Sequence, residues 1–476
     1  MRRTKLVATI GPASESPEML KKMIDAGMNV ARIGMAHGTL DEHLAKYHRI
    51  RKVAAELNAE VGILADLPGP KVRCASFPEG GAVLVDGASI RFTVGEASSS
   101  AELISADYEG LVENIDVGDQ LALGDGNIVF SVQAKTASEL QAVVIRGGLA
   151  QGRPGLQVPS EKLRIATPTP EDFTFADAFV EVGVDMIALS FVRSAHDIRS
   201  LGVEAAPRGP LVIAKVETKA AVDNLEGIIE ASGAVMVARG DLGIDFPLSE
   251  LPHLQKHIIR RCVALGRPVI TATQMLESMV YAPAPTRAEA SDVANAVFDG
   301  SSAVMLSGET AVGVDPVNAV ATMAEIALRA DESFDHDGWA EGISAIREGD
   351  ESTEFGAITT DSLTRAACSI AQQVGAQAIL CLSKTGYTVR AVNRFRPPTR
   401  ILAFSNDPRA TAQLSLSWGT EAVTTELLTD PWDLINNAMS LAASHFGCMS
   451  GDKVVVISGQ SNRTLATDTL RVMRIP

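Results

Sequence analysis

Short apolar runs recur along the chain, with longer stretches of helical character between them. Each run is rich in β-branched residues and nearly unbroken by polar ones, which is typical of a parallel strand buried on both faces. Eight strands with intervening helices predict a (β/α)8 TIM barrel, whose active sites lie at the carboxyl ends of the strands. The runs are KLVATIG from residue 5, VARIGM at 30–35, VGILAD at 61–66, DMIALSF at 185–191, LVIAKVE at 211–217, AVMVARGDL at 234–242, PVITATQ at 268–274 and AVMLSG at 303–308.

Two further units interrupt and follow this barrel. Residues 67–184 separate the third run from the fourth, far more than one crossover helix requires. Inside this stretch, GGAVLVDGASIRFTVG and VGDQLALGDGNIVFSVQA alternate apolar and polar residues between turn signals, which predicts a small inserted β-barrel. Further on, AQAILCLS, TRILAFS and DKVVVISG predict an open α/β sheet.

We therefore expect three domains. The barrel would comprise 1–70 and 169–340, the inserted β-barrel 71–168, and the C-terminal open α/β-sheet domain 341–476. Hinges to the inserted domain are expected near 68–70 and 167–170, where prolines cluster. The charged, glycine-bearing stretch 341–360 is expected to be a linker.

Charged residues end two neighbouring runs of the barrel. In LVIAKVE, Lys215 and Glu217 alternate with apolar residues, so a strand would direct both from one face. The same spacing gives Arg239 and Asp241 one face, with Gly240 between them to admit a ligand close to the backbone. Carboxylates from neighbouring strands suit a hard divalent cation, and a lysine beside it could stabilise a developing oxyanion. Purely structural buried ion pairs are the alternative interpretation.

Composition argues against several classes of partner. The chain has 476 residues, 46% of them hydrophobic, and a formal net charge of −16. These values exclude wholesale disorder and disfavour nucleic acid or anionic membrane as the main partner. The five cysteines lack metal-finger spacing, and no window approaches 18 uninterrupted apolar residues. We expect a cytoplasmic protein with reduced thiols that binds neither nucleic acid nor membrane.

Six long sequence segments resemble segments of the pyruvate kinase family, and they follow one another in the same order as in that family. The resemblance implies an inserted domain that closes over the nucleotide, a C-terminal regulatory domain and a homotetramer. It also implies phosphoryl transfer from phosphoenolpyruvate to ADP, giving pyruvate and ATP, with Mg²⁺ or Mn²⁺. The segments are KLVATIGPAS at 5–14, GMNVARIGMAHG at 27–38, AKVET at 214–218, VARGDLG at 237–243, ATQMLESM at 272–279 and PTRAEASDVANAVFDGSSAVMLSGETAVG at 285–313.

The same resemblance implies roles for single residues. Glu217 and Asp241 would hold the divalent ion, and Lys215 would stabilise the moving phosphoryl group. Thr273 would assist proton transfer to the enolate through water, because a threonine hydroxyl is too weak an acid alone. The substrate would contact Arg32, Ser190, Lys215, Gly240, Asp241 and Thr273; Arg32 and Arg73 would clamp phosphate oxygens, and His37, Lys71 and Arg73 would face the nucleotide.

A glycine-bearing loop in the C-terminal domain resembles the effector loop of the family. The word SKTGYT at 383–388 follows a predicted strand, and hydroxyls and amides there would cradle a sugar phosphate. An ordinary strand-to-helix turn is the alternative interpretation. The implied effector-binding residues are Ser383, Lys384, Thr385, Gly386, Thr388 and Arg463.

The chain departs from the family in the potassium site. Potassium-dependent members bind the ion through an asparagine, a serine, an aspartate and a threonine, and here Gly34, Ala36 and Leu67 replace all but Asp66. No potassium is therefore expected. Lys71 stands where potassium-independent members carry a lysine, and its ammonium can supply the missing charge. A surface lysine at the hinge is the alternative interpretation.

A second departure lies on the nucleotide side. Glu171 replaces a lysine that faces phosphate, and Gly34 and Ala36 have no side-chain oxygen. These changes leave two other functions open. One is a divergent paralogue that performs metal-enolate chemistry on phosphoenolpyruvate, pyruvate or oxaloacetate with an acceptor other than ADP. The other is a non-catalytic sensor of an effector.

Overall fold

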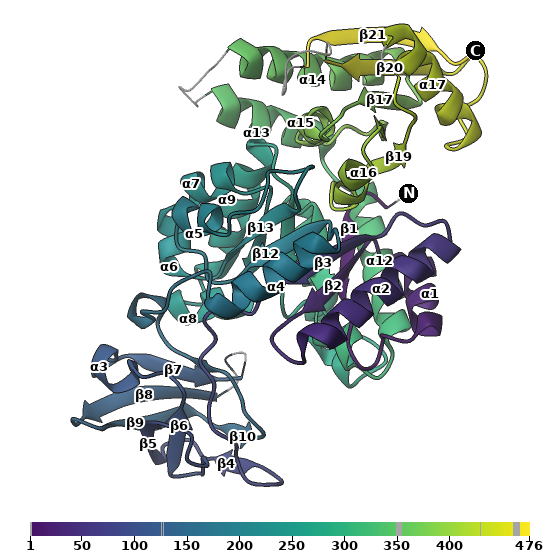
Figure 1. The fold of residues 1–476 in the computed structure, drawn as a ribbon. Helices are drawn as coiled ribbons and strands as arrows, with labels where there is room; N and C mark the ends of the chain where they lie inside the picture. The colour runs from purple at the N-terminus through teal and green to yellow at the C-terminus, as the bar shows by residue number, and fades with distance from the viewer. Residues whose placement is uncertain (1, 125, 127, 349–354, 429, 460–466) are drawn as a thin grey trace.

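The computed structural model describes residues 2–124, 126, 128–348, 355–428, 430–459 and 467–476. An inserted β domain, a barrel and a C-terminal α/β domain follow one another along the molecule (Figure 1). Two adjacent connections join the inserted domain to the barrel (Figure 1). The predicted fold class is confirmed.

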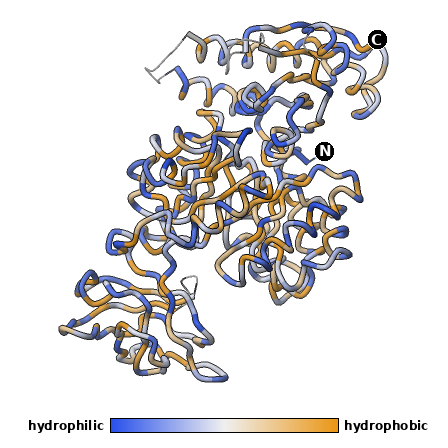
Figure 2. The backbone as a smooth tube through the Cα atoms, viewed as in Figure 1, coloured by the Kyte–Doolittle hydropathy of each residue, from blue (hydrophilic) through white to orange (hydrophobic). Residues whose placement is uncertain are grey.

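All eight predicted strands form the barrel. They are parallel and close in the order β1-β16-β15-β14-β13-β12-β3-β2. Most are buried along their whole length, which explains why they are continuous apolar runs rather than alternating ones. The most hydrophobic stretches of the chain gather in these strands (Figure 2). The strands are β1 (Lys5–Thr9), β2 (Val30–Gly34), β3 (Gly62–Asp66), β12 (Met186–Leu189), β13 (Leu211–Val216), β14 (Ala234–Ala238), β15 (Val269–Ala272) and β16 (Ala303–Leu306).

Helices surround the barrel and pack on its outer face. Alternate strand residues such as Ala214 and Val216 contact this helical layer, whereas Leu211 and Ile213 fill the interior. Lys215 continues the interior series, so the barrel directs its ammonium inward. The helices are α1 (Pro17–Asp25), α2 (Leu40–Glu56), α4 (Pro170–Glu181), α5 (Ala195–Ser200), α6 (Lys219–Asp223), α7 (Leu225–Ala231), α8 (Arg239–Asp245), α9 (Leu251–Ala264), α10 (Arg287–Phe298), α11 (Gly308–Ala311), α12 (Pro316–Glu332) and α13 (His336–Glu348), with a 3₁₀ turn η2 (Glu277–Val280).

The inserted domain has its own core. Its strands form a six-stranded sheet, β11-β7-β8-β9-β5-β6, and a pair, β10-β4. Phe92 and Phe130 meet edge to face in the core, with ring centroids 5.0 Å apart. The elements are β4 (Ala82–Leu84), β5 (Ser89–Val94), β6 (Leu103–Ala106), α3 (Leu111–Asn114), β7 (Gln120–Leu123), β8 (Ile128–Lys135), β9 (Glu139–Arg146), β10 (Gly148–Ala150), β11 (Leu156–Gln157) and the 3₁₀ turn η1 (Ser160–Lys162).

The C-terminal domain is an α/β sheet in the order β19-β18-β17-β20-β21. Along β17, Ile379 and Cys381 pack under α14 and α15, whereas Ala378 and Leu380 pack under α17, so helices cover both faces. The elements are α14 (Phe355–Val374), β17 (Ala378–Leu382), α15 (Tyr387–Asn393), β18 (Arg400–Ser405), α16 (Pro408–Leu414), β19 (Thr420–Thr424), α17 (Pro431–Ser444), β20 (Lys453–Ser458) and β21 (Thr469–Arg474).

The C-terminal domain closes the amino-terminal end of the barrel. Leu416 is fully buried and joins the cluster of side chains inside the barrel. The Gln413 amide donates to the carbonyls of Asp185 and Gly209, at 3.2 and 3.0 Å. Contacts of this domain with the barrel therefore lie at the end opposite the carboxyl ends of the strands.

Two expectations about the C-terminal third need correction. The expected linker at 341–360 is helical wherever the structure describes it, because α13 continues to Glu348 and α14 begins at Phe355. The sheet also contains β19 and β21, which the sequence analysis missed. Both are half-exposed edge strands, and so they lack the continuous apolar runs by which the other strands were found. No helix in the described ranges is long and apolar enough to cross a membrane.

A buried aspartate ties the two connections of the inserted domain together. Asp172 caps α4 by accepting from the Thr169 backbone N–H at 2.8 Å, and its other oxygen accepts from the Gly69 N–H at 3.0 Å. Gly69 has φ of +66°, and a Cβ there would lie 2.7 Å from the Cβ of Ser190. The start of the first connection is thus fixed against the end of the second.

We expect Asp172→Ala to lower the stability of the barrel by about 2 to 3 kcal/mol, because it removes a helix cap and leaves the Gly69 N–H unpaired. Differential scanning calorimetry would detect this as a lower Tm. The matched control is Asp177→Ala, an exposed carboxylate of the same helix, which should change stability by less than about 0.5 kcal/mol. Equal Tm values for the two variants would contradict the proposal that Asp172 holds the two connections together.

Candidate active site

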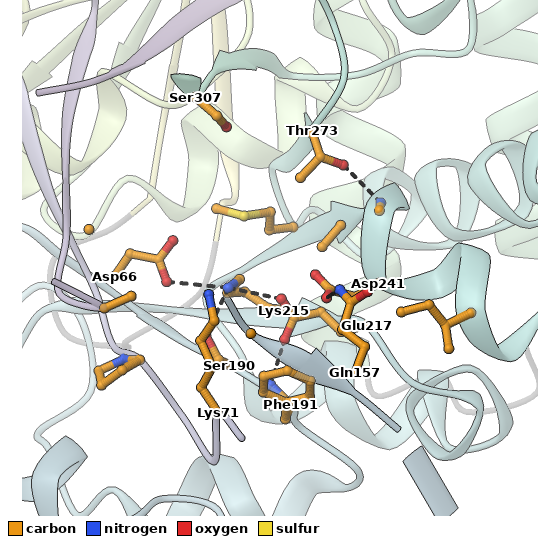
Figure 3. A pocket seen from close by; sticks show the side chains of 18 of the residues that line it. Asp66, Lys71, Gln157, Ser190, Phe191, Lys215, Glu217, Asp241, Thr273 and Ser307 are labelled. Atoms are coloured by element: carbon orange, nitrogen blue, oxygen red, sulfur yellow. Dashed lines mark hydrogen bonds and ion pairs between the residues drawn. The ribbon is translucent and has the colours of Figure 1, made fainter. Parts of the chain in front are cut away.

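A cleft of about 370 Å³ lies between the carboxyl ends of the barrel strands and the base of the inserted domain. This size suits a small ligand that is held largely out of water. Many residues singled out in the sequence meet here, and Figure 3 shows their side chains converging. The cleft is lined by Arg32, Gly34, Ala36, Asp66, Leu67, Lys71, Ser190, Lys215, Glu217, Gly240, Asp241 and Thr273, among others.

Lys215 occupies the centre of a network of ion pairs and hydrogen bonds. Its Nζ lies 2.8 Å from Glu217 Oε1 and 3.5 Å from Asp66 Oδ1. It also donates to Ser190 Oγ at 2.8 Å, and that hydroxyl donates to the Leu67 carbonyl at 2.7 Å. The expected pairing of Lys215 with Glu217 is present, and Ser190 fixes the direction of the ammonium.

The network keeps these groups charged. Burial works against the charge of Lys215, but Asp66 and Glu217 outweigh burial and raise the pKa of the ammonium above its usual value. Burial also opposes ionisation of Asp66, but Lys215 and Arg32 outweigh it and lower the pKa of this carboxyl. Lys215 is therefore a cation near pH 7 and cannot serve as a general base there.

Asp66 is shared between two cations. Besides Lys215 it pairs with Arg32, whose Nε lies 2.6 Å from Asp66 Oδ2. Arg32 Nη1 donates to Thr9 Oγ1 at 2.9 Å, so the guanidinium is held from both sides. Two positive charges thereby face one part of the cleft, which suits an anionic ligand such as a phosphate group.

Two carboxylates from neighbouring strands meet beside Lys215. Glu217 follows β13 and is buried, and its Oε2 accepts from the Phe191 N–H at 2.6 Å. Asp241, in the first turn of α8 after β14, points toward Glu217 in Figure 3 and accepts from the Gln157 amide at 3.0 Å. Mg²⁺ typically takes one or two protein carboxylates and completes its shell with water and substrate oxygens, so this pair fits such an ion. The described residues contain no cluster of three or more potential metal ligands.

Thr273 lies in a strained turn that Arg239 holds in place. Thr273 and Gln274 have φ of +64° and +53°, each at a cost of about 1 to 3 kcal/mol for a residue other than glycine. Arg239 donates through Nε and Nη2 to the carbonyls of Ala272 and Thr273, at 3.3 and 2.6 Å. Its Nη1 pairs with Asp292 at 2.6 Å. The turn therefore presents Thr273 to the cleft in a fixed orientation.

The prediction that Arg239 and Asp241 share one face is wrong. The strand ends at Ala238, and both residues lie in α8, where a spacing of two separates side chains by about 200°. Between them, the Gly240 N–H donates to Thr273 Oγ1 at 2.9 Å (dashed line in Figure 3). That hydroxyl in turn donates to the Ala272 carbonyl at 2.7 Å.

The inserted domain contributes a residue that the sequence analysis missed. Gln157, at the end of β11, reaches the carboxylate of Asp241. The η1 turn adds a second contact, because the Ser160 N–H donates to Asp245 at 3.1 Å. A glutamine in a short edge strand carries no sequence signal for such a role, since its partner is distant in sequence. The base of the inserted domain thus rests on the carboxylates of α8.

The residues expected near the nucleotide lie at the rim. Lys71 lines the cleft and directs its ammonium toward the Asp66 and Lys215 pair in Figure 3. Arg73 does not line the cleft, but it donates to the carbonyl of Ala36, which does. His37, the residue after Ala36, is exposed. Burial, with the charges of Arg73 and Lys71, lowers the pKa of His37 below its usual value. The rim is therefore positively charged and leaves His37 neutral near pH 7.

Two sequence departures have different structural consequences. Gly34 and Ala36 line the cleft and offer it no side-chain oxygen. Glu171 is exposed in the first turn of α4 and is not among the residues that line the cleft.

The predicted effector loop connects β17 to α15. Gly386 has φ of +75°, and the Tyr387 N–H donates to Thr385 Oγ1 at 3.4 Å. Thr388 is buried, and its hydroxyl hydrogen-bonds that of Thr467 at 2.8 Å. Ser383 and Lys384 complete the loop, with Lys384 exposed. Arg463, expected opposite this loop, lies outside the described residues.

Comparison with known proteins agrees with this geometry. The family described as pyruvate kinase, barrel domain, matches residues 1–320, and pyruvate kinase, alpha/beta domain, matches residues 361–473. A pyruvate kinase from Mycobacterium intracellulare is 38% identical over 482 residues, covering 100% of this chain and 98% of that protein. One from Bacillus licheniformis is 37% identical over 477 residues, covering 99% and 80%. The crystal structure of a pyruvate kinase from Cryptosporidium parvum superimposes with a TM-score of 0.88 at 30% identity, covering 100% of this chain and 96% of that one. This chain belongs to the pyruvate kinase family.

Proposed function

We propose that this cleft carries out the family reaction with a divalent ion held by Glu217 and Asp241 and without potassium. The chain is a phosphotransferase that moves the phosphoryl group of phosphoenolpyruvate to ADP and gives pyruvate and ATP. The observation that carries the assignment of residues is the fixed ammonium of Lys215 between Asp66 and Glu217. Phosphoryl transfer depends mainly on positioning and on charge that is already in place, and this network supplies both.

Each side chain has a role that its contacts support. Lys215 and Arg32 stabilise negative charge on the phosphoryl group as it moves, and Ser190 orients Lys215. Mg²⁺ or Mn²⁺, when bound by Glu217 and Asp241, supplies a Lewis acid for the substrate oxygens. The Asp241 N–H would face the substrate carboxylate, and the Gly240 N–H, which here donates to Thr273 Oγ1, would do so in exchange for that bond.

Thr273 serves proton transfer rather than phosphoryl transfer. Its hydroxyl bonds to the Gly240 N–H and the Ala272 carbonyl, and the strained turn aims it into the cleft. A hydroxyl is too weak an acid to protonate the enolate alone, so Thr273 orders a water molecule that delivers the proton. Arg239 is the positioning residue for this turn.

Three observations support potassium independence. Gly34 and Ala36 offer no side-chain oxygen, and Leu67 is buried and apolar. Asp66 already has two cationic partners. Lys71 enters the same cleft from the hinge, which places an ammonium where a monovalent ion would balance the anionic substrates. Arg73 and His37 would contact the nucleotide from the rim.

The other functions that the sequence left open are not favoured. The relatives named above are pyruvate kinases over nearly the whole length of this chain, which disfavours an acceptor other than ADP and a purely non-catalytic sensor. A sugar-phosphate effector at 383–388 and a homotetramer remain proposals that rest on family likeness. The left-handed Gly386, which opens α15, supports the first.

We expect pyruvate formation from phosphoenolpyruvate, ADP and Mg²⁺ to proceed equally in potassium chloride and in tetramethylammonium chloride. Lys71→Glu should lower turnover on the order of 10²-fold, because it replaces a built-in cation with an anion. Potassium should not restore this variant, because Gly34, Ala36 and Leu67 cannot ligate the ion. Lys52→Glu, at an exposed position of α2, is the control. Activation of the wild-type protein by potassium of tenfold or more would overturn the proposal.

We expect Gln157→Leu to raise the Mg²⁺ concentration for half-maximal turnover by about 10-fold, with a smaller change in kcat. The amide orients the Asp241 carboxylate from outside the metal shell, and loss of such a partner typically weakens metal binding by 10- to 100-fold. A titration of activity against Mg²⁺ measures the effect. Gln151→Leu, an exposed glutamine of the same domain, is the control. An unchanged Mg²⁺ requirement would mean that the contact has no such role.

A further inference from the structure

A second, much smaller cavity lies at the other end of the barrel, between the barrel and the C-terminal domain. Its volume is about 20 Å³, room for roughly one water-sized particle. The barrel contributes residues that precede β15 and β16, at the amino-terminal ends of the strands, so this cavity is separate from the catalytic cleft. The barrel side is lined by Val263, Gly266, Arg267, Pro268 and Ser302, and the other side by Arg390, Asn393, Arg394, Arg396, Ser417 and Trp418.

Four arginines surround this cavity, and its described lining contains no carboxylate. Arg394 and Arg396 are 5% and 1% exposed, so both are desolvated. Asp361 pairs with Arg394 from outside the cavity, and Asp331 accepts the backbone N–H groups of Arg3 and Thr4 and acts on Arg396 only through its charge. The positive charge around the cavity therefore exceeds the negative charge that the protein places near it.

Several buried donors of these side chains have no hydrogen-bond partner in the described protein. Arg396 donates through Nη2 to the Gly300 carbonyl, but its Nε and Nη1 are unpartnered. Arg390 donates through Nη2 to the Thr385 carbonyl at 2.9 Å, and its Nη1 is unpartnered. Unpartnered groups also include Arg394 Nε, Ser417 Oγ and Trp418 Nε1. Each buried donor without an acceptor costs about 1 to 3 kcal/mol, and more when charged.

The pKa values of the lining arginines reflect the same excess of positive charge. Burial, together with the like charge of Arg267, lowers the pKa of Arg390 to about 10. Burial lowers the pKa of Arg396 to about 9, with Asp331 opposing the shift and Arg3 adding to it. Burial is also the first cause of the lowered pKa values of Arg267 and Arg394. An anion inside the cavity would reverse these shifts.

Aromatic rings hold the central arginine in position. The guanidinium carbon of Arg396 lies 4.6 Å from the ring centroid of Trp418, 5.6 Å from that of Trp339 and 6.0 Å from that of Phe334. Such contacts are attractive but supply no acceptor for the remaining N–H groups. Arg396 is thus held in position while its Nε and Nη1 lack an acceptor.

We propose that this interdomain cavity binds one chloride ion, held by the unpartnered N–H groups of Arg390 and Arg396 and by the indole N–H of Trp418. Chloride is smaller than a tetrahedral phosphate or sulfate ion and therefore suits this small cavity better. A water molecule would fit as well, but it would leave the excess of positive charge in place. The ion bridges the barrel and the C-terminal domain. Because Arg390 also donates to Thr385, the ion is connected to the loop at 383–388.

Crystals of the full-length protein grown in sodium bromide test the site directly. Bromide replaces chloride and scatters anomalously, so we expect an anomalous peak between the guanidinium groups of Arg390 and Arg396. Density at this position without an anomalous signal, at saturating bromide, would mean that water occupies the cavity and would overturn the proposal.

Thermal unfolding in solution tests whether the ion matters outside a crystal. Replacing sodium gluconate with sodium chloride at constant ionic strength should raise Tm by about 2 to 4 °C for the wild-type protein. Sodium phosphate at the same ionic strength should not reproduce this rise. In Arg390→Met the chloride-dependent rise should fall at least twofold, whereas Arg91→Met, an exposed arginine of the inserted domain, should keep it.

The outcomes that contradict the proposal are distinct. A bromide peak without any chloride-specific rise in Tm would mean an adventitious ion only. An equal rise with phosphate would mean a general anion effect and not this cavity. If Arg390→Met does not fold, the bromide experiment on the wild-type protein still decides whether the site exists.

Discussion

The fixed ammonium of Lys215 is the interaction on which the site depends. Two buried carboxylates, Asp66 and Glu217, hold it at the carboxyl end of the barrel and keep it protonated against the cost of burial. Removing one partner of such a network typically costs about 3 to 5 kcal/mol, because it leaves a buried charge uncompensated. Glu217 faces both Lys215 and Asp241, and Asp66 faces both Lys215 and Arg32. A metal position and a phosphate position therefore share one set of charges, and neither can move without the other.

Much of this arrangement could be predicted because it is local in the sequence. A strand directs residues two apart from one face, so Lys215 and Glu217 could be paired from spacing alone. Arg239 and Asp241 have the same spacing but lie in a helix, since a strand's end cannot be located to the residue from hydrophobicity. Gln157 could not be predicted, because its contact with Asp241 joins two domains that are adjacent only in space. The family resemblance supplied roles that the residues alone left open.

The two ends of the barrel handle charge in different ways. At the carboxyl ends of the strands, cations and carboxylates are paired with one another, and together they suit anionic substrates and a divalent ion. At the amino-terminal ends, arginines surround a small cavity without a carboxylate in its described lining. The C-terminal domain reaches this second end through Leu416 and Gln413, and Arg390 lines the cavity there. A charge bound there can join the two domains without contacting the catalytic cleft.

The most direct measurement of the central claim is the rate of pyruvate and ATP formation by Lys215→Met beside the wild-type protein. The control is Lys219→Met, an exposed lysine of α6. We expect the wild-type protein and the control to form pyruvate and ATP in equal amounts and at equal rates. In Lys215→Met we expect a loss on the order of 10³-fold, with the far-ultraviolet circular dichroism of a folded protein. A folded Lys215→Met variant that retains turnover within a few-fold of the wild-type protein would contradict the central claim.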